Sequence, residues 1–154
     1  MAIPITVTKS TISTRAWNLL FKVLNDNLTN PHTSGKWIYA AYPEDKVTET
    51  SYPLLVIPPV SVAMNRLTLG INGFISVPIT SDIEIYTTRM DSLDSIADEI
   101  VSTIDNQLDT FYDNGLTFVR ASRSSSNTYW TGKIRIHSRV LTYDWIFEFE
   151  SGNP

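Results

Sequence analysis

Residues 83–114, IEIYTTRMDSLDSIADEIVSTIDNQLDTFYDN, decide the fold, because they predict a strand that leads directly into a long helix. After the strand at 83–87, apolar residues recur at steps of three and four and fall on one side of a helix: Leu93, Ile96, Ala97, Ile100, Ile104, Leu108 and Phe111. Asp91 or Ser92 can cap its start, and Asn114-Gly115 suits its end. We expect one helix of about 20 residues and about 30 Å, long enough to cover a sheet.

The chain sorts its charges by element. Residues 91–114 contain seven Asp or Glu and no Lys or Arg, whereas residues 117–142 contain five Lys or Arg and no Asp or Glu. Most of the acidic residues fall on the helix face opposite its apolar side. That face is either an ordinary solvated surface or an anionic surface that meets a cationic partner.

The other segments predict one further helix and several strands. Residues 13–28 have a broad apolar side and predict a helix that Asn30-Pro31 ends. Residues 37–42 predict a short strand, and the apolar run 54–57 predicts a strand buried on both faces. Residues 75–87 keep apolar residues at odd positions throughout, which predicts one long strand.

Two stretches predict loops that project from the domain. Residues 61–73 predict a long loop or a projecting hairpin, and residues 122–132 predict a polar, flexible loop after a strand at 117–121. We expect partner contacts from these two loops, at Arg66, Leu69, Asn72, Arg123, Asn127 and Trp130.

The last strand, residues 133–150, carries two different patterns. In its first half Ile134 and Ile136 share one face, and the basic residues Lys133, Arg135 and Arg139 share the other. In its second half the apolar residues take the odd positions: Leu141, Tyr143, Trp145, Phe147 and Phe149. The apolar face therefore changes near Val140, which predicts a bulge or a twist in this strand.

This order of elements predicts an α+β fold, a mixed β-sheet with two helices packed on it and long loops or a hairpin projecting. A length of 154 residues favours a single domain over 1–154, with residues 1–13 as an extended arm. A net charge of −4 argues against general nucleic-acid binding. The start of the chain does not resemble a signal peptide, and no run is long and apolar enough to predict a membrane span.

No pattern of residues predicts catalysis, a cofactor or a metal. The chain has no cysteine, and its two histidines, His32 and His137, are far apart in sequence. Nothing orients His137 as a base between Arg135 and Arg139. The spacing of Asp105, Asp109 and Asp113 could hold a hard cation, but calcium loops need closer oxygens and a turn. We therefore expect a protein that is not an enzyme.

Four stretches, taken in order, resemble a known family. They are YPLLVI at 52–57, DIEIY at 82–86, LDSIADEI at 93–100 and HSRVLTYDW at 137–145. In that order, over about residues 52–150, the chain resembles the tail terminator (tail completion) proteins of long-tailed bacteriophages. The resemblance implies a small domain without catalytic residues, part of the virion at the junction of tail and neck and present in the host cytoplasm during assembly.

The resemblance also implies how the protein works. A hexameric ring of subunits would cap the tail tube, stop its polymerisation and meet a head-closure or neck protein, while DNA passes through without specific binding. Two alternatives stay open: another head–tail connector or neck component, and a non-viral α+β ligand-binding module. Ring interfaces join two different surfaces, so we expect an acidic row on one subunit (Asp94, Asp98, Asp105, Asp109) to face a basic row on the next (Lys133, Arg135, Arg139).

Overall fold

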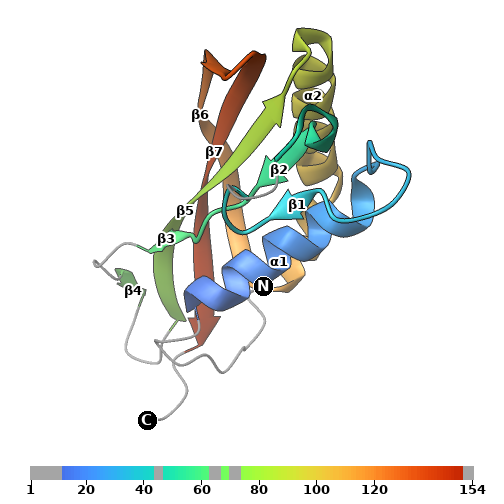
Figure 1. Cartoon of the computed structure of the whole chain (residues 1–154). Helices are drawn as coiled ribbons and strands as arrows, with labels where there is room; N and C mark the ends of the chain where they lie inside the picture. The colour runs from blue at the N-terminus through green and yellow to red at the C-terminus, as the bar shows by residue number, and fades with distance from the viewer. Residues whose placement is uncertain (1–11, 44–46, 63–66, 70–73, 151–154) are drawn as a thin grey trace.

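The computed structural model describes residues 12–43, 47–62, 67–69 and 74–150 (Figure 1). Three α-helices and a mixed sheet of seven strands confirm the predicted α+β class. The elements are α1 (Ile12–Asn27), β1 (Ile38–Tyr39), a 3-10 helix η1 (Glu49–Ser51), β2 (Leu54–Val56), β3 (Ser61–Val62), β4 (Leu67–Leu69), β5 (Phe74–Thr87), α2 (Met90–Asn106), α3 (Leu108–Asp113), β6 (Leu116–Thr131) and β7 (Ile134–Glu150). The predicted arm, residues 1–13, lies outside the described residues up to residue 11.

The sheet runs in the order β1-β2-β5-β7-β6, so β1 and β6 are its two edges (Figure 1). The pairing of β1 with β2 is parallel, and the other pairings are antiparallel. β3 and β4 pair with β5 beyond β2, where the sequence predicts a loop or hairpin at 61–73. β5 and β7 form the centre, in one unbroken register from Phe74 opposite Glu150 to Thr87 opposite His137.

The helices cover one face of this sheet, which we call the helix face. Odd-numbered side chains of β5 and β7 point into it and join α1 and α2 in the main core; they include Ile83, Ile85, Leu141, Trp145 and Phe147. From α1, the predicted apolar side supplies Ala16, Leu20, Val23, Leu24 and Leu28, all buried, while Trp17 and Leu19 are partly buried. Burial of this apolar area is the main force that holds the helices on the sheet.

The predicted single long helix is wrong in one respect: it breaks at Gln107 into α2 and α3. The Gln107 backbone, at φ −106° and ψ 15°, leaves the helical region, and its N–H still donates to the carbonyls of Thr103 and Ile104. After the break Phe111 is fully buried against Trp145, with ring centroids 4.6 Å apart, whereas Leu108 is 42% exposed. The break therefore changes which side chains of the segment face the core.

The sequence predicted the end of the helical segment correctly but not the residue that caps its start. Neither Asp91 nor Ser92 is the cap of α2, because Arg89 holds that position and no side chain caps it. Asp91 instead accepts hydrogen bonds from the Arg89 guanidinium at 2.7 Å and 3.1 Å, and this ion pair lowers the pKa of the Asp91 carboxyl. Asn114-Gly115 does end α3, with Gly115 at φ 87°.

The bulge predicted in the last strand near Val140 is wrong, because β7 keeps its register with β5 through that point. The apolar positions change face for another reason: the sheet has apolar packing on both faces. A second group of side chains, the outer cluster, lies on the face away from the helices. It comprises Tyr52, Leu54, Val56 and Ile136, with Tyr39, Tyr42, Val47, Tyr86, Tyr129 and Ile134 packed against them. Even positions of β7 therefore serve one cluster and odd positions the other.

The flexible loop predicted at 122–132 is wrong as well. These residues continue β6, which pairs with β7 in unbroken register from Arg123 opposite Thr142 to Thr131 opposite Ile134. Gly132, at φ 63°, makes the tight turn between the two strands. A long partner strand here outweighs the weak strand preference of the serine run. The two bulges of the sheet occur in β6, between Thr117 and Arg120 and between Ala121 and Arg123.

Tyr143, in the main core, makes stability sensitive to alkaline pH. Burial, and then the nearby Asp105 carboxylate, raise the pKa of its phenol from 10.0 to about 12. Below pH 10 the phenol is neutral in both states and its contribution is complete; above it the unfolded chain ionises first, so stability falls as pH rises to about 12. A shift of this size corresponds to a loss on the order of 2 kcal/mol.

We therefore expect Tyr143→Phe to flatten the fall in unfolding free energy over this pH range, measured by urea denaturation at a series of pH values. An unchanged slope in the Phe variant would mean that the Tyr143 phenol does not cause the alkaline loss of stability.

Candidate interaction surfaces

One ion pair that was predicted between subunits forms within a single subunit. Arg139 lies on the helix face of β7, and its Nη2 is 2.7 Å from Oδ1 of Asp94 on α2. Its Nε donates to the Ser126 hydroxyl at 3.1 Å. Arg139 reaches the acidic helix of its own subunit because the odd side of β7 faces α2. The Arg139–Asp94 contact is therefore not free to join two subunits.

The other residues of the predicted interface are exposed. Asp98, Asp105 and Asp109 lie on the outer surface of α2 and α3, and Lys133 and Arg135 lie at the turn end of the β6–β7 hairpin. Within the described part of the chain, none of the five has an ion-pair partner. Their place at an interface between subunits stays a prediction.

The residues expected in two partner-contact loops fall in different settings. Arg123, Asn127 and Trp130 belong to the strand β6. Leu69 belongs to β4, where it pairs with Phe74 of β5. Arg66 and Asn72 lie outside the described residues. The contact surface that the sequence predicted as loops is thus a rigid strand edge wherever the structure describes it.

Trp130 stands out at the end of the hairpin. It is 67% exposed, the highest value among the large hydrophobic side chains that the structure describes. It sits opposite Arg135 in the strand register, one residue before the final pair of the hairpin. Tryptophan is enriched among the residues that contribute most to binding at protein interfaces, so Trp130 is a candidate contact residue.

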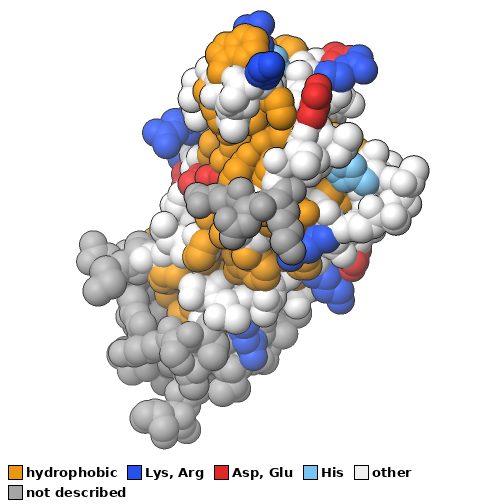
Figure 2. Space-filling view, in the orientation of Figure 1, with side chains coloured by type: hydrophobic (Ala, Val, Ile, Leu, Met, Phe, Trp, Pro, Cys, Tyr) orange, Lys and Arg blue, Asp and Glu red, His pale blue; other side chains and the backbone are white. Residues whose placement is uncertain are grey.

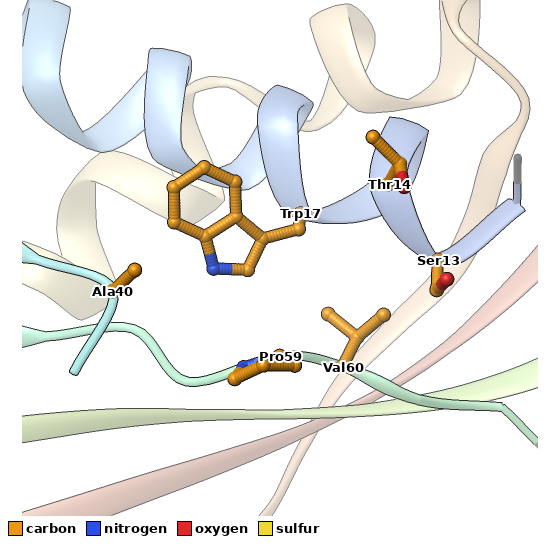
Figure 3. A pocket seen from close by; sticks show the side chains of 6 residues that line it. All are labelled: Ser13, Thr14, Trp17, Ala40, Pro59 and Val60. Carbon is orange, nitrogen blue, oxygen red and sulfur yellow. The ribbon is translucent and has the colours of Figure 1, made fainter.

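The opposite side of the molecule contains an apolar pocket (Figure 3). It has a volume of about 260 Å³ and is lined by Ser13, Thr14, Trp17, Ala40, Pro59 and Val60. Figure 3 shows the Trp17 indole descending from α1 as one wall, with Ala40, Pro59 and Val60 facing it from the segments after β1 and β2. The Trp17 Nε1–H donates to the Ile57 carbonyl at 2.7 Å, and its ring stacks on Phe21 at 5.1 Å. These contacts fix the wall of the pocket.

Hydrophobic side chains gather on the same side of the molecule around β1 and β2 (Figure 2). The outer cluster, on the face of the sheet away from the helices, is an apolar group that sequence reasoning did not find. Tyr42 and Tyr52 share a hydrogen bond between their hydroxyls, and Tyr86 donates to Glu84 at 2.9 Å. Burial, and then these hydrogen bonds, raise the pKa of the Tyr52 and Tyr86 phenols, which therefore stay neutral. The sequence did contain a sign of this cluster. Ile134 and Ile136, like Leu54 and Val56, lie two residues apart and so share one face of their strand.

The structure places His137, the histidine considered as a base, in the packed interior of the sheet. His137 is buried on the helix face, and its Nδ1 lies 3.0 Å from the Thr128 hydroxyl, so the ring is part of the packing. Among the residues that the structure describes, no three His, Cys, Asp or Glu side chains come together as metal ligands. No helix in this part of the chain combines the length and hydropathy needed to cross a bilayer.

No family model matches the chain, and no curated protein matches it. Among solved structures, the chain is similar to one chain of the structure titled "Virion of native gene transfer agent (GTA) particle". The two are 12% identical, the likeness covers 86% of this chain and 93% of that chain, and the TM-score is 0.49. A likeness this distant assigns no function to the present chain.

Proposed function

We propose that this protein is a structural component of a phage-like virion that forms a ring at the end of the tail tube, as tail terminator proteins do. The proposal rests on one observation: the four stretches that resemble tail terminator proteins come together in the fold. They form β2, the end of β5, α2 and the middle of β7. These elements are neighbours in space: β2, β5 and β7 are consecutive strands of the sheet, and α2 packs on β5 and β7.

The two edges of the subunit also suit a ring. A closed ring with head-to-tail contacts needs two different surfaces that complement each other. One edge of this sheet ends in the short strand β1 beside an apolar pocket, and the other ends in the long strand β6 with a projecting tryptophan. The exposed charged residues Asp98, Asp105, Asp109, Lys133 and Arg135 would contribute to register at that interface rather than to raw affinity, because exposed ion pairs give about 0–1 kcal/mol each.

In this proposal the ring is hexameric, stops tube polymerisation, and presents its other face to a head-closure or neck protein while DNA passes through. The protein then has no enzymatic activity or cofactor of its own. It acts in the virion at the junction of tail and neck, after assembly in the host cytoplasm. Another connector of the neck is the second candidate, and it shares the ring but contacts a different partner.

Deletion of the gene tests the terminator role. Without a cap, tube subunits continue to add, so electron microscopy of the lysate should show tubes longer than wild-type tails and heads without tails. A plasmid copy of the wild-type gene should restore both. Tails of normal length in the deletion lysate, joined to heads or not, would rule out the terminator role; normal tails with unjoined heads would favour the neck connector.

A further inference from the structure

We propose that Trp130 of one subunit inserts into the Trp17–Pro59 pocket of a second copy of this chain. The contact would be the anchor of the head-to-tail interface, and so it rests on the ring of the proposed function for its biological use. The physical case for the contact, however, comes from the tryptophan, the pocket and their positions.

The pocket has the size and lining of a site for one aromatic side chain. Its volume of about 260 Å³ lies below the roughly 300–1,000 Å³ of most small-molecule sites. Among the residues that the structure describes, no charged side chain lines it, and four of the six lining residues are Trp, Ala, Pro and Val. The hydroxyl of Ser13 at its rim can accept the indole N–H, the one polar group that a buried tryptophan must satisfy.

Two other open pockets of similar size fit Trp130 less well. The one beside α1 and Phe147, about 280 Å³, contains Arg15 and Lys22, and the one beside Pro78, about 300 Å³, contains the ion pair of Arg120 and Asp144. Arg135 lies opposite Trp130 in the hairpin and Lys133 lies in the adjoining turn, so both cations would come close to the pocket that Trp130 enters. Like charges would meet in the first of those pockets, and in the second the tryptophan would cover an ion pair, whereas none of the described residues that line the Trp17 pocket is charged.

The positions of Trp130 and of the pocket require two molecules. Trp130 belongs to β6, one edge strand of the sheet, while the pocket lies between α1 and the segments after β1 and β2, at the other edge. The strands β5 and β7 stand between them, so a subunit cannot fill its own pocket with its own Trp130. A second copy can, and repetition of the contact joins subunits edge to edge.

A cysteine-free chain allows a direct test of this contact. Thr14→Cys marks the pocket rim and Thr131→Cys marks the hairpin next to Trp130; both threonines are exposed. The two single-cysteine proteins are mixed and treated with a short bismaleimide linker over a range of concentrations. We expect a cross-linked heterodimer in the mixture and much less product from either protein alone.

Three variants test whether Trp130 holds the two subunits together. Trp130→Ala in the Thr131→Cys chain, or Ala40→Phe in the Thr14→Cys chain to fill the pocket, should each weaken the association about tenfold or more, as expected for an aromatic anchor. Tyr112→Ala, which removes another exposed aromatic side chain, should leave the yield unchanged. Thermal denaturation confirms that each variant is folded.

The outcomes separate this contact from the proposed function. A heterodimer that both Trp130→Ala and Ala40→Phe abolish supports the contact. No heterodimer at any concentration, or a yield that Trp130→Ala does not change, overturns it. If Trp130→Ala abolishes the cross-link but the gene deletion still gives tails of normal length, the contact stands and the terminator role fails. If the cross-link never forms but the deletion gives overlong tubes, the role stands and this contact fails.

Discussion

Replacement of Phe111 by alanine should lower the free energy of unfolding by about 3–5 kcal/mol, the usual range for a buried phenylalanine. The Phe111 side chain is fully buried, and its ring lies 4.6 Å from that of Trp145 at the foot of the main core. The truncation leaves a cavity between α3 and the sheet and removes the main apolar anchor of this six-residue helix. Urea denaturation followed by circular dichroism measures the loss.

Leu108 supplies a matched control on the same short helix. The sequence pattern puts Leu108 and Phe111 on one apolar side, but the break at Gln107 leaves Leu108 42% exposed. Leu108→Ala should therefore cost less than about 0.5 kcal/mol, as exposed positions usually do. Equal losses at the two positions would mean that α2 and α3 form one continuous helix in solution.

Replacement of Ile136 by alanine should cost about 2–5 kcal/mol, the range for a buried isoleucine. Ile136 is fully buried on the face of the sheet away from the helices, in the outer cluster with Tyr52, Leu54 and Val56. If this cluster is part of the cooperative core, the unfolding transition should move to lower urea concentration and remain a single step.

Ile134 lies two residues earlier on the same face of β7 and is only partly buried. Ile134→Ala should cost about 1 kcal/mol or less, because the side chain keeps much of its contact with water. A small effect at Ile136, equal to that at Ile134, would show that the outer cluster contributes little to stability and that the helix face alone forms the core.

The sequence was sufficient for the parts of the fold that one periodicity controls. The apolar sides of α1 and α2 follow from steps of three and four, and the long strand β5 follows from steps of two. Each of these segments buries its predicted residues in the main core, so local pattern and packing agree.

The sequence was not sufficient where the partner of a segment decides its conformation. The serine run at 124–126 has the composition of a loop, and β7 makes it a strand. Gln107 fits a helix interior by propensity, yet Phe111 reaches Trp145 only after the break. The short strand predicted at 37–42 is reduced to Ile38–Tyr39, because β2 offers only a short stretch for it to pair with.

The surface position of the charged residues was predicted, and their place at an interface stays a prediction. The exposed charges of Asp98, Asp105, Asp109, Lys133 and Arg135 are where the sequence placed them, on surfaces. The Arg139–Asp94 pair could not be foreseen, since it depends on which face of β7 the helix covers. The pocket joins Trp17 to residues more than twenty positions away, and no local pattern marks such a site.

Apolar packing on both sides of β7 has a consequence for how this protein can vary over evolutionary time. Loss or gain of one residue between Ile136 and Leu141 would turn every following side chain to the opposite face, so that tyrosine, tryptophan and phenylalanine would leave the main core together. A substitution in this stretch changes one side chain, whereas a change in chain length affects both clusters at once. β6 has already absorbed two extra residues as bulges at the sheet edge. We expect related chains to differ in length in β6 and at its turn, and to keep the length of β7 fixed.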